Sequence, residues 1–277
     1  MLHPYFQPII RRIVAGKMRF RLLSNGTAVT SEVVNFLADS GMCDRIQLSL
    51  DGFEKYHDSI RGSGVFRRVL ASIEMLSHRE IPVTVNVVVC KENLPEILEF
   101  AHFLETLPVQ SYRLNPRNDH AVDSETIPDR FSLDDLAELI ARLDGEVARL
   151  PHLSPKSPPL QMLRQLRAPR GAANACSGCS APHYMFTVLP DGGVVPCSDA
   201  LDFVVGQIEQ STVMDIWNND GFQAFRERVQ TMEPRNNPEC EECPYTYECR
   251  RFCPLTDNLY YCRKRLAQKL AERGVRI

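Results

Sequence analysis

The first 116 residues alternate between segments of helical periodicity and short, strongly apolar segments. Four short segments predict strands, at residues 19–23, 45–50, 83–89 and 111–115, and the third is rich in β-branched residues. Segments with apolar residues three and four apart predict helices at residues 4–15, 31–41, 65–79 and 93–107. The helix at 31–41 has two possible N-caps, Thr30 and Ser31. Alternating strands and helices with short connections favour parallel βαβ units, so we predict an α/β fold with a parallel sheet.

After residue 116 the chain becomes more polar and richer in proline. Residues 131–150 predict a helix with Ser132 as its N-cap and acidic residues in its first turn. The remaining segments predict a loop at 117–130 and a proline-rich linker at 151–169 that contains a short helix at 160–166. A hairpin is predicted at 185–197, a broken helix at 214–232 and a closing helix at 262–273.

Composition and charge indicate an ordinary globular protein. The chain has 277 residues, of which 44% are hydrophobic and 24% charged, and its net charge is −3. It is long enough to bury a sizeable core, and its charge gives no bulk attraction to nucleic acid or to a membrane surface. It has no apolar run of membrane-spanning length and no signal-peptide pattern at its start. We therefore expect a cytoplasmic protein, in which disulfides are rare.

Eight of the ten cysteines follow a regular spacing in the second half of the chain. They form C-x2-C-x12-G-x4-C and then C-x2-C-x5-C-x3-C-x8-C. Thiolates bind soft metals, and sets of four cysteines hold zinc or iron–sulfur clusters. Eight ligands suffice for two complete sites, although disulfides or free thiols are the alternative. The eight positions are Cys176, Cys179, Cys197, Cys240, Cys243, Cys249, Cys253 and Cys262.

This spacing resembles that of radical S-adenosylmethionine (radical SAM) enzymes with a C-terminal SPASM domain. The SPASM signature is C-x9-15-G-x4-C, a gap, C-x2-C-x5-C-x3-C, a gap and a last cysteine, and residues 179–262 match every fixed interval. Two softer similarities lie upstream. SNGT at 24–27 looks like the family's TNGT, and LSLDG at 48–52 with HDSIRG at 57–62 looks like its SLDG…HxxxRG. Together these similarities cover nearly the whole chain.

The resemblance implies the fold and its division into domains. We expect a partial (β/α)6 radical SAM barrel, consisting of the last four βα units, at residues 1–116. A helical linker would follow at 117–170, and a small cysteine-rich α+β SPASM domain with auxiliary clusters would occupy 171–277.

One departure from the family is severe. The C-x3-C-x2-C motif that binds the catalytic cluster is missing, and Cys43 and Cys90 cannot replace it. The chain starts with residues that resemble those just after the family's GGEP motif. We therefore expect an N-terminal truncation that is inactive alone, and the alternative is a remnant without radical chemistry.

The resemblance also implies two auxiliary [4Fe–4S] clusters held by interleaved cysteines. Cys176, Cys179, Cys197 and Cys253 would hold one cluster, and the other would be held by Cys240, Cys243, Cys249 and Cys262. The signature does not fix Cys176, and without it the first cluster would have an open iron for substrate. The structural alternative is two zinc sites that only stabilise a loop-rich domain. A third, catalytic [4Fe–4S] cluster would require the missing upstream segment.

S-adenosylmethionine would bind at the C-terminal ends of the strands, where barrel active sites lie. By resemblance, Ser24 and Ser49 would bind the methionyl amino and carboxylate groups, and Arg61 could pair with the carboxylate. The simpler interpretations are that Ser24 starts a turn and that Arg61 is solvated. The resemblance also implicates Asn25 and Asp51. Asn86 and Leu114 could lie near the adenosine or ribose. Asp51 could instead cap a turn, and Leu114 could be core.

Four other positions have both a structural and a functional interpretation. Some relatives carry a carboxylate base directly after the cysteine equivalent to Cys197, where this chain has Ser198. Asp199, one position further, is the only candidate catalytic residue, and otherwise it is a loop residue. The remaining three are interpreted as structural. Gly192 would form a tight turn, His57 would be part of a loop, and Cys90 would be a buried inert thiol.

The function implied by the resemblance is that of an oxidoreductase or maturase. It would act on a peptide or protein side chain through a 5′-deoxyadenosyl radical, with a flavodoxin- or ferredoxin-like reductant as partner. A tetrapyrrole-type cofactor precursor is the alternative substrate. Two other classes stay open: a non-catalytic iron–sulfur electron-transfer or peptide-binding protein, and a zinc-stabilised binding module. Neither nucleic acid nor a membrane is expected as a partner.

Overall fold

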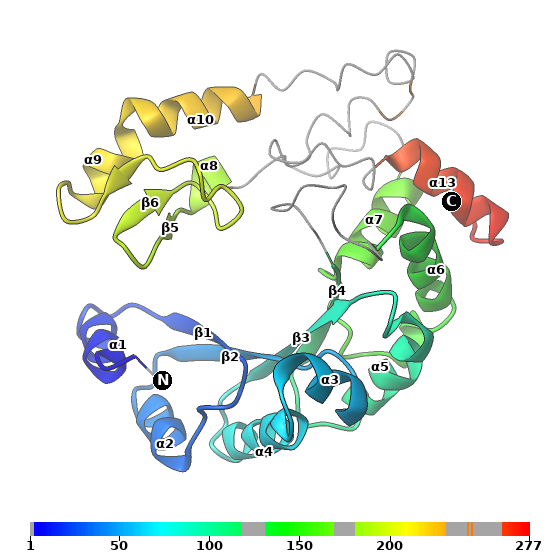
Figure 1. Ribbon diagram of the computed structural model, residues 1–277, viewed down its shortest axis with the longest axis horizontal. Coiled ribbons are helices and arrows are strands. Elements are labelled where there is room, and N and C mark those ends of the chain that lie inside the picture. The colour runs from blue at the N-terminus through cyan, green and yellow to red at the C-terminus, as the bar shows by residue number, and fades with distance from the viewer. Residues whose placement is uncertain (1–2, 118–130, 169–180, 231–242, 244, 246–261) are drawn as a thin grey trace. The chain divides into compact units, whose positions relative to one another are not determined.

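Four parallel strands form the sheet of the N-terminal half, in the order β1-β2-β3-β4 (Figure 1). Each lies within two residues of its predicted range, so the strand predictions and the α/β fold class are confirmed. Consecutive strands are neighbours and run in the same direction, which requires a crossover connection after each of the first three. The strands are β1 (Phe20–Ser24), β2 (Cys43–Ser49), β3 (Val83–Val89) and β4 (Ser111–Pro116).

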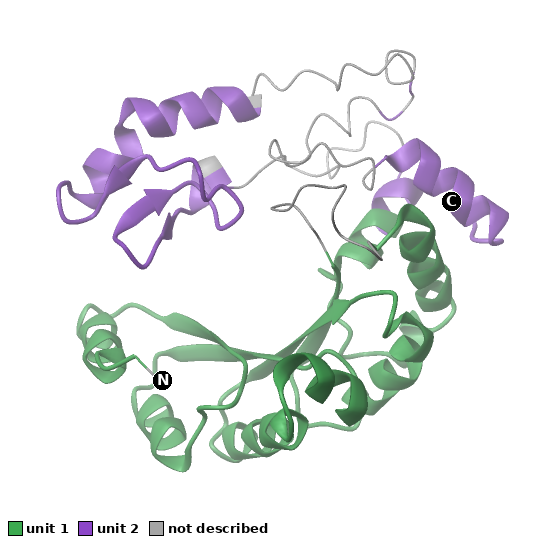
Figure 2. Ribbon diagram, viewed as in Figure 1, with its two compact units in different colours: residues 1–117, 129–163 green, residues 118–128, 164–277 purple. Residues whose placement is uncertain are grey.

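This structure is a computed structural model, and it describes residues 3–117, 131–168, 181–230, 243, 245 and 262–277. The chain divides into two compact units (Figure 2): residues 1–117 with 129–163, and residues 118–128 with 164–277. The three-part division expected from the sequence stays a prediction, and most of the expected loop at 117–130 lies outside the described residues. None of the described helices is long and apolar enough to cross a membrane.

One face of the four-stranded sheet is apolar and covered by helices (Figure 1). Val83, Val85, Val87 and Val89 alternate along β3, and each is at most 1% exposed. Successive side chains of a strand point to opposite faces, so all four lie on the helix side. Burying each such side chain contributes about 1.5–3 kcal/mol. The covering helices supply fully buried partners such as Ile73 of α4.

Five helical segments of the first unit agree with the sequence prediction. Two carry short 3₁₀ turns, Leu94–Glu96 before α5 and Val147–Arg149 after α6. Ser132 caps α6 as predicted, in a capping box with Asp135. The helices are α1 (Phe6–Ala15), α2 (Ser31–Asp39), α4 (Val65–His78), α5 (Ile97–Glu105) and α6 (Leu133–Asp144).

Helix α3 (Glu54–Arg61) was not predicted, and the loop interpretation of His57 is wrong. His57 is the only buried residue of this helix, so the apolar stripe that identifies an amphipathic helix is absent. The helix is tied instead to the next one through Asp58. Its carboxylate accepts hydrogen bonds from the backbone N–H groups of Gly64 (2.6 Å) and Phe66 (2.8 Å). These donors at the start of α4 have no partner within that helix, so Asp58 satisfies them.

The described part of the second unit contains a small antiparallel sheet and several helices. The predicted hairpin is confirmed as β5 (Thr187–Val188) and β6 (Gly193–Val195), with Gly192 in the turn at φ +85°. A third strand, β7 (Gly206–Gln207), was not predicted because two residues are too short for a periodicity. The broken helix is confirmed as α9 (Val213–Asn218) and α10 (Asp220–Gln230). The other helices of this unit are α8 (Ala181–Tyr184) and α13 (Arg263–Glu272). Helix α7 (Pro158–Arg167) begins in the first unit and ends in the second.

The N-cap of α2 provides a test of this local structure. The Thr30 hydroxyl accepts a hydrogen bond from the N–H of Val33 (3.3 Å), whereas the Ser31 hydroxyl contacts only the sulfur of Met75 (3.7 Å). We expect Thr30→Ala to lower the free energy of unfolding by about 1 kcal/mol, because an orphan helix donor is left unpaired. The matched control Ser31→Ala should stay close to the wild type. Denaturant unfolding followed by circular dichroism checks both, and equal losses would contradict the assignment of Thr30.

Candidate functional site

The sheet face opposite the helices carries a polar row near the C-terminal ends of the strands. Strand register aligns Ser49 of β2 with Asn86 of β3, and Asn86 with Arg113 of β4. Aligned residues of neighbouring parallel strands point to the same face. We call this the open face, and its positions are Arg21, Leu23, Arg45, Gln47, Ser49, Thr84, Asn86, Val88, Ser111, Arg113 and Asn115.

Two of the predicted S-adenosylmethionine residues, Ser49 and Asn86, therefore lie side by side on the open face. Both are partly exposed. The side-chain amide of Asn115 donates a hydrogen bond to Oδ1 of Asn86, so a third polar group joins the row from β4. Sequence analysis included Leu114 but not Asn115. The alternation of exposed polar and buried apolar residues along β4 was the signal that could have found it.

Leu114 lies on the other side of the sheet. Its side chain is fully buried, and its backbone N–H donates to the hydroxyl of Ser157 (3.2 Å). The contacts observed are those of a core residue, so its predicted role near the adenosine stays a prediction.

Ser24 and Asn25 build the turn that follows β1. The Ser24 hydroxyl accepts from the N–H of Gly26 (3.1 Å), and the Asn25 carbonyl oxygen accepts from the N–H of Thr27 (3.1 Å). Gly26 has φ +80°, and the hydroxyl of Ser72 from α4 donates to its carbonyl (2.9 Å). These bonds support the turn interpretation of Ser24 and leave its contact with S-adenosylmethionine a prediction.

Asp51 connects three elements at the end of β2. It is 3% exposed, and its carboxylate accepts from Nε of Arg61 (2.6 Å) and from the backbone N–H of Val88 (2.9 Å). Its own backbone N–H donates to Nδ1 of His57 (3.1 Å), and its carbonyl accepts from the amide of Asn93 (2.7 Å). A buried carboxylate needs such partners, since leaving one unpaired costs several kcal/mol. Asp51 thus fixes the strand end that carries Ser49.

The simpler interpretation, in which the Arg61 side chain is solvated, does not hold. Its side chain is 28% exposed, and its Nε is bound to Asp51. The predicted pairing with a ligand carboxylate stays a prediction.

Asn93 was expected only to lie at the start of a helix. It bridges the strand ends, because its amide donates to Asp51 and to the carbonyl of Val88 (2.8 Å) while its oxygen accepts from the N–H of Cys90 (2.8 Å).

His57 is a neutral, structural histidine. It is fully buried, and burial lowers its pKa below the usual 6.5. Because Nδ1 accepts the hydrogen bond from Asp51, the proton is assigned to Nε2. Among the described residues, Nε2 has no hydrogen-bond partner.

Three of the eight predicted metal ligands are described, and all three are partly exposed: Cys197, Cys243 and Cys262. Cys197 follows β6 and packs against a small apolar cluster with Phe225, and Cys262 is the N-cap residue of α13. The other five, Cys176, Cys179, Cys240, Cys249 and Cys253, lie outside the described residues. Among the residues that the structure describes, no three His, Cys, Asp or Glu side chains lie together as a metal site. Asp199 is exposed, two residues beyond Cys197.

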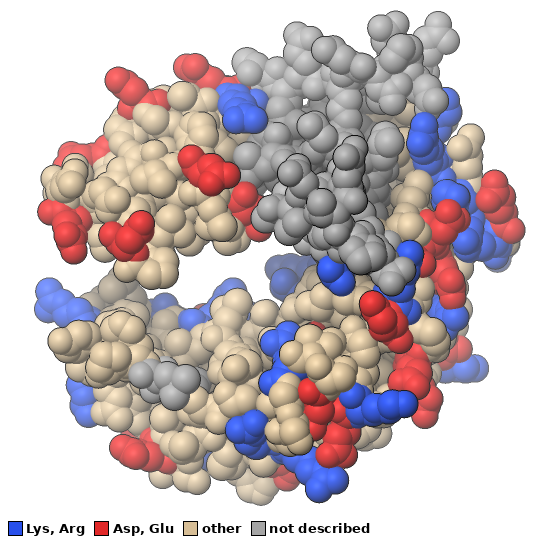
Figure 3. Space-filling view, in the orientation of Figure 1, with Lys and Arg blue, Asp and Glu red and all other residues tan. Residues whose placement is uncertain are grey.

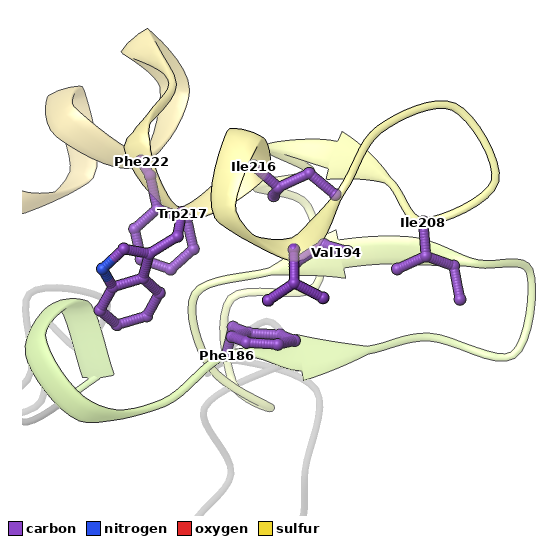
Figure 4. Close-up of a pocket in the computed structure, with 7 residues that line it drawn as sticks. Phe186, Val194, Ile208, Ile216, Trp217 and Phe222 are labelled. Atoms are coloured by element: carbon purple, nitrogen blue, oxygen red, sulfur yellow. The ribbon is translucent and has the colours of Figure 1, made fainter.

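Apolar side chains hold the hairpin that leads to Cys197. Figure 4 shows Phe186, Val194, Ile208, Ile216, Trp217 and Phe222 around one pocket, contributed by the hairpin, the segment after β7, and α9 and α10. The rings of Trp217 and Phe222 lie 4.8 Å apart, and the guanidinium of Arg226 lies 4.8 Å from each ring. Such contacts fix the ring orientations. They pack the helices against the hairpin whose second strand precedes Cys197.

The other two cysteines are unsuited to hold a cluster. Burial raises the pKa of Cys43 to about 11, and it also raises the pKa of Cys90. Cys90 is 7% exposed, which confirms the prediction of a buried thiol. Metals bind the thiolate form. The residues present therefore do not fit the catalytic cluster, whereas Cys197, Cys243 and Cys262 supply the donor type that iron–sulfur clusters take.

Comparison with known families identifies both halves. The radical SAM superfamily model matches residues 1–104, and the SPASM model, described as an iron-sulfur cluster-binding domain, matches residues 158–244. The chain belongs to the radical SAM superfamily and carries a SPASM domain. Its cofactors are accordingly S-adenosylmethionine and iron–sulfur clusters, as the sequence predicted.

Two kinds of curated relative match this radical SAM/SPASM chain in part. The AdoMet-dependent heme synthase of Methanosarcina barkeri is 36% identical over 99 residues, which are 35% of this chain and 28% of that protein. The mycofactocin maturase MftC of Mycolicibacterium smegmatis is 32% identical over 98 residues, which are 35% of this chain and 25% of the maturase. The matches therefore span little more than a quarter of these relatives.

Solved structures confirm the fold of the radical SAM/SPASM chain. Native anSMEcpe with bound AdoMet superposes with a TM-score of 0.70 at 17% identity, covering 92% of this chain and 73% of anSMEcpe. Streptococcus suis SuiB bound to the precursor peptide SuiA gives 0.69 at 16% identity, covering 96% of this chain and 63% of SuiB.

The lowered pKa of His57 predicts a pH dependence of stability. As the pH falls below about 6.5, the unfolded chain takes up a proton on His57 that the folded chain does not, so the free energy of unfolding falls. We expect His57→Gln, whose amide oxygen can still accept from Asp51, to show a smaller decrease between about pH 7 and pH 5. Denaturant unfolding across this range measures the slope.

His78→Gln is the control, because His78 is exposed on α4 and should keep the wild-type slope. A wild-type slope in His57→Gln would show that the buried histidine does not stay neutral in the folded chain.

Proposed function

We propose that this chain provides the cofactor- and substrate-binding sheet and the auxiliary-cluster domain of a radical SAM enzyme that modifies a peptide or protein side chain. The observation that carries the proposal is the polar row at the strand ends. Its members Ser49 and Asn86 lie within the part matched by the radical SAM family, and a matched SPASM domain follows. The names of MftC, a maturase, and of SuiB bound to a precursor peptide support a peptide substrate.

The described residues divide the binding task. Ser49 would bind the methionyl amino or carboxylate group of S-adenosylmethionine, and Asn86 would lie near its ribose or adenine. Asp51 would act as a positioning residue, because its bonds to Arg61 and Val88 hold the end of β2. Ser24, Asn25, Arg61 and Leu114 would complete the site through the turn and the strand edge. Asp199 is the candidate base near the first auxiliary cluster.

Radical chemistry needs a part that this sequence lacks. When bound to the catalytic cluster, S-adenosylmethionine supplies the family's 5′-deoxyadenosyl radical, and that cluster takes three cysteine ligands. Cys43 and Cys90 do not fit this role, so we assign no step of radical generation to the residues of this chain. Within the proposal, the chain binds and orients cofactor and substrate.

The auxiliary clusters would occupy the interleaved cysteine sets inferred above. Their role in the proposal is to accept or relay an electron or to anchor substrate, with a flavodoxin- or ferredoxin-like reductant as partner. A cytoplasmic location would keep the eight thiols reduced.

A second candidate function has one specific observation in its favour. The heme synthase shares 36% identity with this chain over 99 residues, slightly more than MftC does. A tetrapyrrole-type substrate is therefore the alternative to a peptide. Binding assays with an iron porphyrin and with peptides would separate the two.

The metal content tests the auxiliary clusters. After anaerobic reconstitution we expect about eight iron atoms and matching sulfide per chain, and Cys197→Ala should reduce this to about four by losing one cluster. Cys43→Ala is the control and should keep the wild-type iron content. About two zinc ions without sulfide would instead support a structural metal module.

Binding of S-adenosylmethionine tests the sheet. We expect Ser49→Ala to weaken binding by roughly tenfold, because a hydrogen bond to a charged ligand group contributes about 1.5–3 kcal/mol. Equilibrium dialysis with labelled S-adenosylmethionine measures the dissociation constant. Ser77→Ala, near the C-terminal end of α4 and away from the open face, is the matched control. An unchanged affinity in Ser49→Ala would remove Ser49 from the site.

A further inference from the structure

Residues 181–220 combine negative charge with exposed apolar side chains. They contain no Lys or Arg, and their six acidic residues are all exposed. They also carry eight of the fifteen large apolar side chains that are exposed among the described residues. Single exposed apolar residues are normal, whereas such a concentration indicates an interaction surface. The acidic residues are Asp191, Asp199, Asp202, Glu209, Asp215 and Asp220.

Part of this apolar surface surrounds the pocket of Figure 4. Ile208 and Val213 line the pocket and are 44% and 50% exposed. Val188 is paired with Val194 across β5 and β6, so both side chains point to the same face of the sheet, and Val194 lines the pocket. We call Val188, Ile208 and Val213 the apolar rim. The rim and the pocket form one apolar surface built by the hairpin, the segment after β7 and α9.

Carboxylates adjoin the apolar rim. Glu209 follows Ile208 directly in the chain. The N–H of Ile208 donates to the carbonyl of Gly192 (3.0 Å), which brings the turn that contains Asp191 next to the rim. Figure 3 shows acidic side chains around an apolar surface where Figure 1 places the hairpin and α9. A surface with one sign of charge attracts groups of the opposite sign.

The size and charge of this surface favour one kind of occupant. The open space of the pocket is about 190 Å³, below the roughly 300 Å³ at which small-molecule sites begin, so it suits a single aliphatic side chain. A second copy of the chain would bring an equally acidic surface against this one in a symmetric pair, and membrane surfaces carry anionic lipids. A peptide segment with Lys or Arg beside aliphatic side chains has the complementary properties.

We propose that the apolar rim is a docking site for a basic, apolar peptide segment of a protein partner. One aliphatic side chain of the segment would enter the pocket, and its Lys or Arg side chains would lie against the carboxylates of Asp191 and Glu209. The apolar contact would supply most of the affinity, and the charges would supply attraction and orientation. The inference goes beyond the proposed function, because none of these residues belongs to the open face or to the predicted cluster ligands.

Three peptides test the proposal on the full reconstituted chain: acetyl-Lys-Leu-Lys-Leu-Lys-amide, acetyl-Glu-Leu-Glu-Leu-Glu-amide and acetyl-Lys-Ser-Lys-Ser-Lys-amide. Calorimetry measures their dissociation constants. The basic apolar peptide should bind roughly tenfold more tightly than either of the others, and salt raised from about 0.05 M to 0.5 M should weaken its binding by screening. Trp217 is the only tryptophan of the chain and lines the pocket, so a change in its fluorescence on binding locates the peptide there.

Variants separate the apolar contact from the charge. Val213→Ser should weaken binding of the basic apolar peptide roughly tenfold, because the rim loses an apolar side chain. Val204→Ser is the matched control, since Val204 is 53% exposed and is not among the residues that line the pocket. Asp191→Asn combined with Glu209→Gln should weaken binding roughly fivefold at low salt and reduce its salt dependence. Glu272→Gln, an exposed position on α13, is the control for charge.

The proposal is overturned if the acidic or the polar peptide binds as tightly as the basic apolar one. It is also overturned if Val213→Ser and Ile208→Ser both keep the wild-type affinity. Sedimentation of the free chain tests a second copy as the occupant, and a dimer that Val213→Ser dissociates would contradict the proposal. Failure of the proposed function would be seen separately, as a chain that binds neither iron nor S-adenosylmethionine.

Discussion

The buried carboxylate of Asp51 is the interaction on which the described site depends. It accepts hydrogen bonds from Arg61 of α3 and from the backbone of β3, while its own backbone is bound by His57 and Asn93. In a parallel sheet the strand ends are otherwise held only by their ladder bonds, which stop where the strands stop. Asp51, with two partners on its carboxylate and two on its backbone, connects the ends of β2 and β3 and the following helix. The geometry of Ser49 and Asn86 depends on that connection.

The two faces of the sheet then have different tasks. The helix side is filled by fully buried aliphatic residues, which supply most of the stability through removal of apolar surface from water. The open face is free of this requirement, so it can carry hydroxyls, amides and guanidinium groups. The same alternation that builds the core thus arranges Ser49, Asn86 and Arg113 in one row.

The second unit relies on a different balance. Its described hairpin, α8, α9 and α10 form two small apolar clusters, one around Phe222 and one around Phe225. Small cores of this kind supply limited stability, and metal ligation by thiolates adds to it. The Trp217–Phe222–Arg226 stack adds to the packing of the first cluster. The cysteine-rich unit is therefore expected to be sensitive to loss of its clusters, while the sheet is not.

The sequence by itself determined the parallel α/β fold, the hairpin, the broken helix and the family, because periodicity and fixed cysteine spacing are local properties of the chain. It missed α3, since a helix with one buried residue has no apolar stripe, and it missed β7, since two residues show no alternation. Only the tertiary structure decided that Thr30 caps α2, that Arg61 pairs with Asp51 and that Leu114 is core. Each of these facts depends on strand register and on contacts between residues distant in the chain, which local pattern does not encode.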